Sequence, residues 1–395
     1  MSGRQESKLP VNVRRAVDAE VFIFIFLFIG FFCACGMKMG TANMFNTMMN
    51  TAYALLMDTV FYIMAIAVLA GAVSALFSEF GVISLLNKVL SLLIHPIYGL
   101  PGASSVGIVT SYLSDNPAIL TLAHDISFRR YFKKYQLPAL TNIGTSFGMG
   151  LIITTYMISL HSPIGENFGV SVLVGNLGAV IGSIISTRLM LRYTAKLYGK
   201  EASCDIDGDD VPFDPIRYRQ VRSGGPGTRV IDALLTGGKN GVEMGMSIIP
   251  GVLIICTIVL MITNSAPAGG YTGAAYEGVG LLPWIGEKLR FIIMPLFGFS
   301  SPEAIAVPIT ALGAAGAAIG IVEKLLAAGQ VNAHDIAVFT SMCMCWSGYL
   351  STHVAMMDSL KCRELTGKAI LYHTIGGICA GIASNWLYTL ITLIL

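Results

Sequence analysis

The feature that most constrains this chain is a segment that recurs at an offset of 199 residues. The first copy, HPIYGLPGASSVGIVTSYLSDNPAI, spans residues 95–119, and the second reads MPLFGFSSPEAIAVPITALGAAGAA. Pro96 aligns with Pro295 and Gly99 with Gly298, and both pairs give the same offset (295 − 96 and 298 − 99). Paired segments interrupted by Gly and Pro in the two halves of a membrane chain are typical of transporter binding sites.

The composition predicts that the chain resides in a lipid bilayer. Of its 395 residues 54% are hydrophobic and only 12% are charged, which leaves too little polar surface for a soluble globule. Its 43 glycines fit membrane helices whose backbones approach closely. The net charge of +2 gives no reason to expect nucleic acid as a partner. The partners that we expect are the lipid bilayer and a small-molecule solute, and assembly into a homo-oligomer is left open.

Apolar segments of about twenty residues, the length that crosses a bilayer, predict the membrane helices. Such segments lie at residues 21–44, 55–78, 136–160, 168–191, 242–263, 335–357 and 369–395, and shorter apolar segments lie at 82–98, 104–123, 279–298 and 303–328. The shorter segments form the two copies of the repeat.

Loop charges predict the orientation of these helices. Basic clusters lie in the segment 129–134, in the linker 188–239 and in the loop 361–368, whereas the loops 161–167 and 263–278 contain no Lys or Arg. Because Lys and Arg near membrane helices stay cytoplasmic, the three basic segments are predicted inside and the two other loops outside. The N-terminus is then cytoplasmic, and the two halves cross the bilayer in opposite directions.

We therefore predict an all-α polytopic membrane protein with two inverted-topology repeats, which contain hairpin and broken-helix elements, and one extra N-terminal transmembrane helix. The predicted divisions are residues 1–50 for the cytoplasmic N-terminus and the extra helix, 51–196 for the first repeat, 197–229 for a cytoplasmic linker and 230–395 for the second repeat. The expected location is the bacterial plasma (inner) membrane.

The motif SDNP predicts a helix break at membrane depth in the first repeat. Pro117 removes a backbone donor, and Ser, Asp and Asn before it favour turns and caps. Asp115 and Asn116 could hold an ion or a solute hydroxyl, or they could cap a helix near the cytoplasmic face. The equivalent motif, GAAG at residues 313–316, offers no side-chain ligand.

The turns GLPGASS (residues 99–105) and GFSSPE (residues 298–303) precede the second helix of each copy. Exposed amides at helix N-termini suit polar or anionic ligand groups. The candidate binding residues in these turns are Ser104, Ser105, Ser301 and Glu303. Glu303 is also placed like an acid that compensates the helix dipole in a first turn.

The segments TNIGTSFGMG (residues 141–150) and TSMCMCWSGYLSTH (residues 340–353) also correspond at the offset of 199. Further candidate binding residues in them are Asn142, Thr145, Ser146 and Ser347. These residues would place polar groups inside a helix bundle. The alternative role for each of them is an interhelical hydrogen bond.

The sequence offers no sign of P-loop or zinc-protease chemistry. No GxxxxGK[ST] or HExxH motif occurs, and GTSFG at residues 144–148, which has the spacing GxSxG, lies within the apolar segment 136–160, so we do not expect an enzyme. The Cys pairs at 33 and 35 and at 343 and 345 are too close for the usual metal hairpin. We expect neither a metal site nor a cofactor. The coupling ion that we expect is Na⁺ or H⁺.

Three stretches of the chain resemble the nucleoside recognition, or Gate-domain, membrane proteins. They are GVEMGMSIIPGVLIICTIVLMI (residues 241–262), PWIGEKLRFIIMPLFGFSSPEAIAVPITALG (residues 283–313) and the first-half counterpart at residues 58–117. That group includes the Gate domains of ferrous iron transporter B, the spore maturation membrane proteins and, more distantly, the concentrative nucleoside transporters. The resemblance implies an inverted repeat whose hairpins and broken helices meet at mid-membrane. The nucleoside transporters carry an Asn-Glu pair at the second hairpin, whereas Ser301-Pro302-Glu303 retains only the acid.

Two hypotheses about function follow from these observations. The first is an ion-coupled secondary-active transporter that moves a small polar solute, nucleoside-like or another metabolite, by alternating access. The second is a membrane scaffold that transports nothing, similar to the spore maturation proteins. In a scaffold, protein side chains should fill the polar breaks.

Overall fold

The computed structural model describes residues 16–113, 131–203, 218–219, 221–313, 315–347 and 349–394. These residues are almost entirely helical and contain no strand, although an isolated bridge joins Lys133 to Ser203. Five of the helical segments are long and apolar enough to cross a membrane: Ala19–Met39, Thr41–Glu79, Gly169–Tyr198, Pro226–Thr263 and Arg363–Ile394. The chain is therefore an all-α polytopic membrane protein, as predicted.

The N-terminal part begins with α1 (Ala19–Met39), which the carboxylate of Asp18 caps through the backbone N–H of Glu20 at 3.0 Å. Gly40, with a φ of 81°, ends α1. A continuous helix of 39 residues follows, composed of α2 (Thr41–Ala54), the π-helix η1 (Leu55–Val60) and α3 (Phe61–Glu79). The first helix therefore ends at Gly40 and not at the predicted residue 44. Residue 50, after which the first repeat was predicted to begin, lies inside the second helix.

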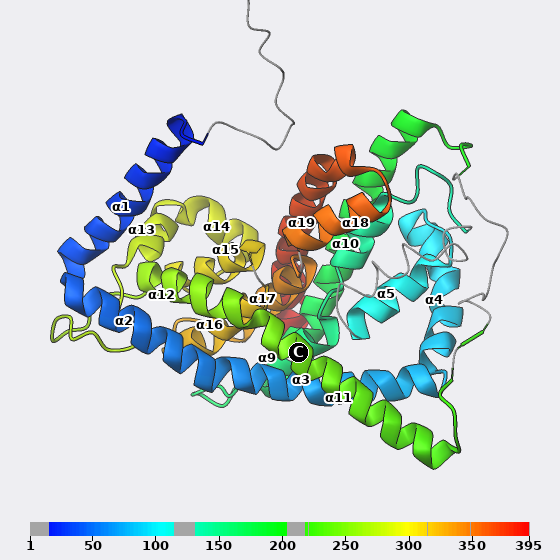
Figure 1. The fold of residues 1–395 in the computed structure, drawn as a ribbon, viewed down its shortest axis with the longest axis horizontal. Coiled ribbons are helices and arrows are strands. Elements are labelled where there is room, and N and C mark those ends of the chain that lie inside the picture. The colour runs from blue at the N-terminus through cyan, green and yellow to red at the C-terminus, as the bar shows by residue number, and fades with distance from the viewer. Residues whose placement is uncertain are drawn as a thin grey trace, which may run out of the picture.

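The second repeat contains a matching long helix, which starts at Pro226 and not at the predicted residue 242. It is composed of α11 (Pro226–Gly251), the π-helix η2 (Val252–Cys256) and α12 (Thr257–Thr263). The two long helices cross (Figure 1). A Cβ atom at Gly71 would lie 2.4 Å from the carbonyl oxygen of Gly237, so the two backbones touch. Contact between η1 and η2 places the two irregular turns beside each other.

The centre of the molecule is built by α10 (Gly169–Tyr198), α17 (Ala333–Cys345) and α19 (Thr366–Ile394). A Cβ atom at Gly182 of α10 would lie 2.4 Å from the carbonyl oxygen of Gly376 of α19. Small residues are needed here because lipid provides no hydrophobic force to hold helices together, so close backbone packing must do so.

One hairpin lies on each side of these central helices (Figure 1). The first consists of α4 (Val82–Tyr98) and α5 (Ser104–Leu113). The second region consists of α13 (Leu281–Lys288), α14 (Arg290–Phe297), the 3₁₀ turn η3 (Pro302–Ile305), α15 (Ala306–Gly313) and α16 (Ala315–Ala327). The segment Arg290–Phe297 is bent by 78° against Pro302–Gly313, so the pair is a broken span or a re-entrant loop.

Two predicted spans are interrupted in the structure, which corrects the expectation that each is one continuous helix. The span 136–160 is divided into α8 (Ala139–Thr145) and α9 (Gly150–Ser159), with Met149 between them in a left-handed conformation (φ 55°). The span 335–357 is divided into α17 and α18 (Tyr349–Ser359), and a short 3₁₀ turn, η4 (Arg363–Leu365), precedes α19. The two interruptions occupy matching positions in the repeats.

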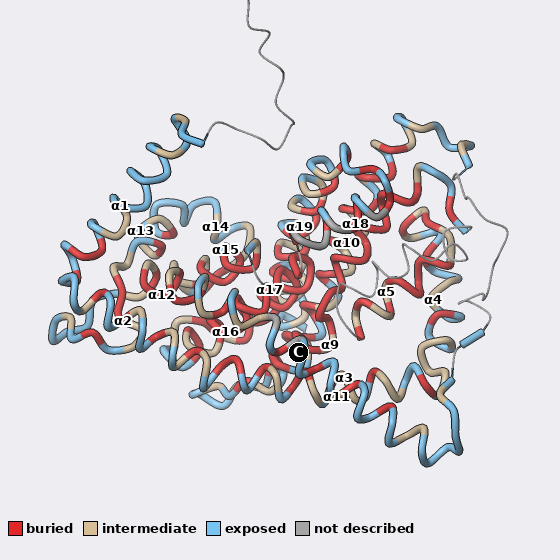
Figure 2. Tube along the Cα trace, in the orientation of Figure 1, coloured by how far each residue is buried: buried red, intermediate tan, exposed pale blue. Residues whose placement is uncertain are grey.

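Burial follows this arrangement (Figure 2). The residues of α8 and α17 are mostly buried, whereas α1 is exposed along most of its length. Exposed Phe and Ile side chains on α1 fit a helix surrounded by lipid. The polar interior therefore lies where the broken helices meet α10 and α19.

A loop, residues 264–280, lies against α2, and a buried carboxylate organises it. Glu277 accepts hydrogen bonds from the backbone N–H groups of Thr272 and Gly273, at 2.9 and 3.0 Å, and from the Thr47 hydroxyl of α2 at 3.3 Å. Burial by itself raises the pKa of Glu277, but these hydrogen bonds outweigh it and leave the pKa below its usual value. The ionised carboxylate thus holds the backbone of the loop together, while the amide of Asn50 on α2 ties the loop to that helix by donating to the carbonyl of Gly273 at 2.8 Å.

Candidate functional site

The two hairpin turns are built on the same backbone plan. Gly99 (φ 79°) and Gly298 (φ 65°) end α4 and α14 in the left-handed conformation that favours glycine. The N–H groups of these glycines bond to the carbonyls of His95 and Met294, which again lie 199 residues apart (294 − 95). The repeat predicted from Pro96, Gly99 and their counterparts is therefore a structural repeat as well.

Side chains from the central helices satisfy the last carbonyls of each hairpin helix. Arg188 of α10 donates to the carbonyls of Pro96 and Ile97, at 2.7 Å each. In the second repeat the amide of Asn385, on α19, donates to the carbonyl of Leu296 at 3.0 Å. The last carbonyls of a helix need such partners because they have none within the helix.

A carboxylate fixes the second turn in addition. Asp335 of α17 accepts hydrogen bonds from the N–H of Ser300 at 3.0 Å and from its hydroxyl at 2.5 Å. The same carboxylate accepts from the N–H of Asn332 at 2.9 Å, which completes a capping box at the start of α17. Gln136 is the equivalent of Asp335 in the first repeat (335 − 199). It accepts a hydrogen bond from the N–H of Lys133 at 2.9 Å, which is the same capping bond, but it has no bond to the first turn among the described residues.

The two helix breaks are joined by a chain of buried polar groups. The amide of Asn142, on α8, donates to the hydroxyl of Ser186 of α10 at 2.8 Å. Ser186 lies 3.2 Å from Nδ1 of His373 of α19, and Nε2 of His373 lies 2.5 Å from the carbonyl of Cys345 at the end of α17. Because a carbonyl only accepts, Nε2 carries the proton and Nδ1 accepts from Ser186. This row of hydrogen-bonded groups links the break after α8 to the break after α17 by way of α10 and α19.

A second histidine extends this cluster. The ring of His353 on α18 lies 4.6 Å from that of His373, centroid to centroid. Its Nδ1 donates to the carbonyl of Tyr349 at 2.5 Å, which leaves Nε2 as an acceptor. Both rings are almost fully buried. Within the described residues, the buried polar atoms near the breaks that have no hydrogen-bond partner are Nε2 of His353, Oδ1 of Asn142, Oγ1 of Thr141 and Nε1 of Trp346.

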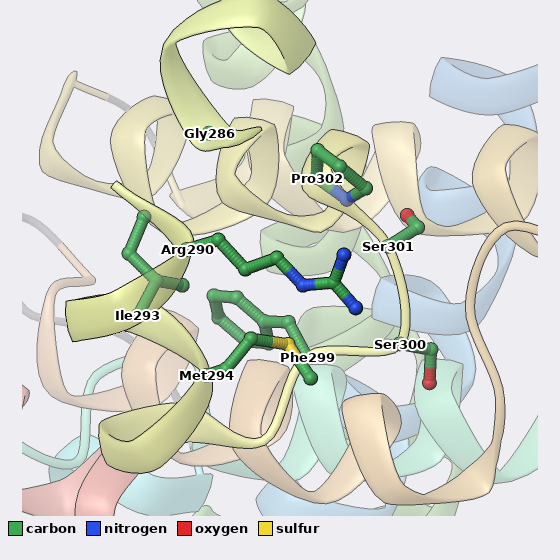
Figure 3. A pocket seen from close by; sticks show the side chains of 8 residues that line it. All are labelled: Gly286, Arg290, Ile293, Met294, Phe299, Ser300, Ser301 and Pro302. Carbon is green, nitrogen blue, oxygen red and sulfur yellow. The ribbon is translucent and has the colours of Figure 1, made fainter. Parts of the chain in front are cut away.

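Beside the second turn lies a cavity of about 180 Å³. The residues that line it are Gly286, Arg290, Ile293, Met294, Phe299, Ser300, Ser301 and Pro302. Figure 3 shows the Arg290 side chain extended across the cavity, with its guanidinium toward Ser300 and Ser301 and the ring of Phe299 alongside. The Oγ atom of Ser301 is buried and has no hydrogen-bond partner.

The structure disperses the residues predicted from the sequence over three places. Ser104 and Ser105 are buried at the start of α5, where Ser105 donates to the carbonyl of Asn87 at 3.3 Å. Ser301 lines the cavity, and Glu303 is half-buried in η3. Asp115 and Asn116 lie outside the described residues.

The remaining predicted residues gather at the breaks, mostly in helix-to-helix or local contacts. Asn142 belongs to the buried chain, whereas Thr145 and Ser146 donate back to the carbonyls of Thr141 and Asn142, at 2.6 and 2.7 Å. Ser347 is fully buried at the second break. The bonds of Thr145 and Ser146 run to carbonyls four residues earlier in the chain, so they are local bonds and not the interhelical bonds given as the alternative role.

Sequence reasoning missed Ser186, His373, Asp335 and Arg290. His373 and Ser186 carried one available signal, since they are polar residues inside apolar segments. Arg290 carried another, a cation directly before the repeated segment. Among the residues that the structure describes, no group of three or more His, Cys, Asp and Glu side chains could hold a metal ion.

The comparisons with known proteins concern the fold. No protein-family model matches the chain, and no curated protein matches it significantly. The chain is similar to the solved structure of the concentrative nucleoside transporter CNTnw in an inward-facing substrate-bound state, with a TM-score of 0.52 and 14% identity over 93% of this chain and 84% of that one. A CNTnw variant in an intermediate state gives a TM-score of 0.51 at 14% identity, with coverage of 85% and 81%. The chain thus has a fold distantly similar to that of CNTnw.

Proposed function

We propose that this chain is a secondary-active transporter, driven by protons or sodium, that moves a small polar solute by alternating access. The observation that carries the proposal is the occurrence of two hairpin turns and two helix breaks at matching positions in the two halves of the chain. Irregular backbone at membrane depth needs a water-filled or protein-lined setting. In transporters with inverted repeats such elements surround the solute. The similarity in fold to CNTnw supports the same interpretation.

The topology and the divisions of the chain belong to this proposal. We place the N-terminus, the linker 197–229 and the loop 358–368 in the cytoplasm of a bacterial cell, around repeats at residues 51–196 and 230–395. Single cysteines at Glu166 and Tyr271 should react with an impermeant thiol reagent from outside intact cells. Labelling of both only after the membrane is opened would contradict the inverted topology.

The test of transport is counterflow and gradient-driven uptake in proteoliposomes. The panel contains nucleosides, amino acids and organic acids, each measured under an imposed proton or sodium gradient. Asn142→Ala removes the amide that links α8 to α10, and we expect it to lower uptake per folded molecule. The matched control is Asn43→Ala, since the Asn43 amide bonds only peripheral carbonyls, of Met39 and Tyr271. Absence of uptake and counterflow for every solute would contradict the proposal.

A second candidate function is a membrane scaffold that transports nothing. The observation that favours it is the buried chain from Asn142 to Cys345, in which polar side chains at the breaks bond one another. A scaffold predicts that Asn142→Ala reduces thermal stability while no solute in the panel is transported. Transport of any solute in the panel would exclude this alternative.

A further inference from the structure

We propose that the cavity between Arg290 and Ser301 binds the carboxylate of a small organic acid. The inference deepens the proposed function, and rests on it, because it names the class of solute that the second turn recognises. Arg290 begins the bent segment Arg290–Gly313, which is apolar enough to form a broken membrane span. A cation within such a segment is costly unless it has a partner or a function.

The donors of Arg290 are available to a ligand. Its ion pair is with Glu287, at 3.6 Å between Nη1 and Oε1, and both side chains are more than half exposed. That separation exceeds the length of a good hydrogen bond, and exposed pairs of this kind are weak. The planar guanidinium presents paired N–H donors that match the two oxygens of a carboxylate.

A second polar group faces the same space. Ser301 is the N-cap residue of η3, yet its side chain makes no capping bond, and its buried Oγ has no partner in the described part of the chain. A buried hydroxyl without a partner is costly, and a bound oxyanion would accept its proton in a hydrogen bond. The oxygens of the neighbouring acid, Asp335, already accept hydrogen bonds from Ser300 and Asn332, so Asp335 does not take up the donors of Arg290.

The cavity also limits the size of the ligand. Its volume is about 180 Å³, whereas one water needs only about 10–15 Å³ of such space, so a solute of several non-hydrogen atoms fits. Ile293, Met294, Phe299 and Pro302 provide apolar walls. A short hydrocarbon body with one carboxylate matches these walls and the single cation.

The first repeat shows that this cavity is not an automatic product of the fold. The residues equivalent to Arg290 and Ser301 are Ser91 and Gly102 (290 − 199 and 301 − 199). A Cβ atom at Gly102 would lie 2.9 Å from the Cβ of Ser91, so the first turn packs directly on its helix. The second repeat therefore has the guanidinium of Arg290 and the hydroxyl of Ser301 at the positions where Ser91 and Gly102 pack against each other in the first repeat.

The test is direct binding to the full chain in nanodiscs of neutral phosphatidylcholine, measured by calorimetry. The probes are acetate, pyruvate and butyrate, with their uncharged methyl esters as matched controls and inorganic phosphate as a second oxyanion. We expect at least one carboxylate to bind and its ester not to bind. Arg290→Gln should weaken binding about ten- to hundred-fold, Ser301→Ala less, and Arg290→Lys should restore part of it.

The control variant is Arg363→Gln, since Arg363 has a similar exposed ion pair, with Asp358 at 3.6 Å, away from the cavity. It should leave binding unchanged. Failure of all three carboxylates to bind, or binding that Arg290→Gln does not alter, overturns the inference. In a parallel set of nanodiscs that contain anionic phosphatidylglycerol, retention of that lipid through Arg290 without carboxylate binding also overturns it and identifies a lipid contact.

The outcome is separable from that of the proposed function. If a carboxylate binds through Arg290 but proteoliposomes transport nothing, the subsite stands and the transporter proposal fails. If a neutral solute is transported equally well by Arg290→Gln and by the unmodified chain, the transporter proposal stands and the subsite is wrong.

Discussion

The two hairpin turns occupy equivalent places in the two repeats, yet only their backbones are alike. Both end a helix with a left-handed glycine, Gly99 or Gly298. The carbonyls before the first glycine are held by the exposed Arg188, and those before the second by the buried Asn385. These two side chains are not equivalent in the offset of 199, since Arg188 corresponds to residue 387 (188 + 199).

The difference teaches which features the fold requires and which it leaves free. A helix that ends inside the molecule must have its carbonyls satisfied, but any donor that reaches them from α10 or α19 will do. The left-handed turn, in contrast, needs glycine in both repeats. Side chains beyond these requirements are free to differ, and only the second turn has a link to a carboxylate, Asp335, and a cavity beside it in the described residues.

The largest expected effect distinguishes the two turns directly. Asp335→Ala removes a carboxylate that holds Ser300 twice and Asn332 once, and it should lower the free energy of unfolding by about 4 kcal/mol. Gln136→Ala, its counterpart, removes one cap and should cost about 1 kcal/mol. Thermal unfolding of both variants in detergent checks this, and equal losses would show that the second turn has no extra anchor.

The next effect concerns an interface that the two repeats share. In Gly182→Ala the new Cβ would lie 2.4 Å from the Gly376 carbonyl and 2.7 Å from the Cβ of Ala380, so α10 and α19 must separate, at a cost of about 3 kcal/mol. Gly30→Ala on α1 is the control, since nothing lies within 4 Å of its Cβ. An unchanged melting temperature for Gly182→Ala would argue against close packing of these helices.

A smaller effect compares the two side chains that hold the hairpin carbonyls. Asn385→Ala should destabilise the protein by about 2 kcal/mol, because it leaves the Leu296 carbonyl without this donor and also breaks the 3.0 Å contact with His334. Arg188→Ala should cost about 1 kcal/mol, since Arg188 is exposed and water can replace it. Thermal unfolding should therefore show a larger loss of stability for Asn385→Ala than for Arg188→Ala. A larger loss for Arg188→Ala would refute the prediction.

The smallest effect lies outside both turns, in the loop 264–280. The pKa of Glu277 is lower in the folded protein than its usual value, so its contribution to stability is present above the unfolded pKa, near 4.5. That contribution is lost as the pH falls through the folded pKa. Glu277→Gln should remove this part of the acid sensitivity of the loop, which limited proteolysis between about pH 3 and pH 7 would detect. A variant as acid-sensitive as the unmodified chain would disprove it.

Much of this comparison can be predicted from the sequence, because it depends on local backbone chemistry. The offset of 199 and the paired glycines are enough to locate both turns along the chain. The exclusion of a soluble fold follows from composition alone. These features are encoded in neighbouring residues, where turn preferences act.

The rest depends on contacts between residues that are distant in the chain. Asn142 meets Ser186 and the carbonyl of Ala369, 44 and 227 residues away, and hydropathy cannot indicate such pairs. The break at Met149 is missed because residues 136–160 form one apolar stretch in the sequence, although Gly150 must approach the Tyr112 ring, where its Cβ would lie at 2.3 Å. The π-helices shift hydrogen bonds by one residue, a change that leaves composition untouched.

The crossed long helices have a consequence for how the protein fits its bilayer. The helix Thr41–Glu79 has 39 residues and, at about 1.5 Å per residue, is about 58 Å long, nearly twice the roughly 30 Å of bilayer hydrocarbon. Such a helix must tilt steeply or emerge from the membrane, and the tilt changes with bilayer thickness. Because Pro226–Thr263 packs on it in backbone contact, the two long helices must tilt together, and any mismatch with the thickness of the bilayer acts on the pair and not on one helix.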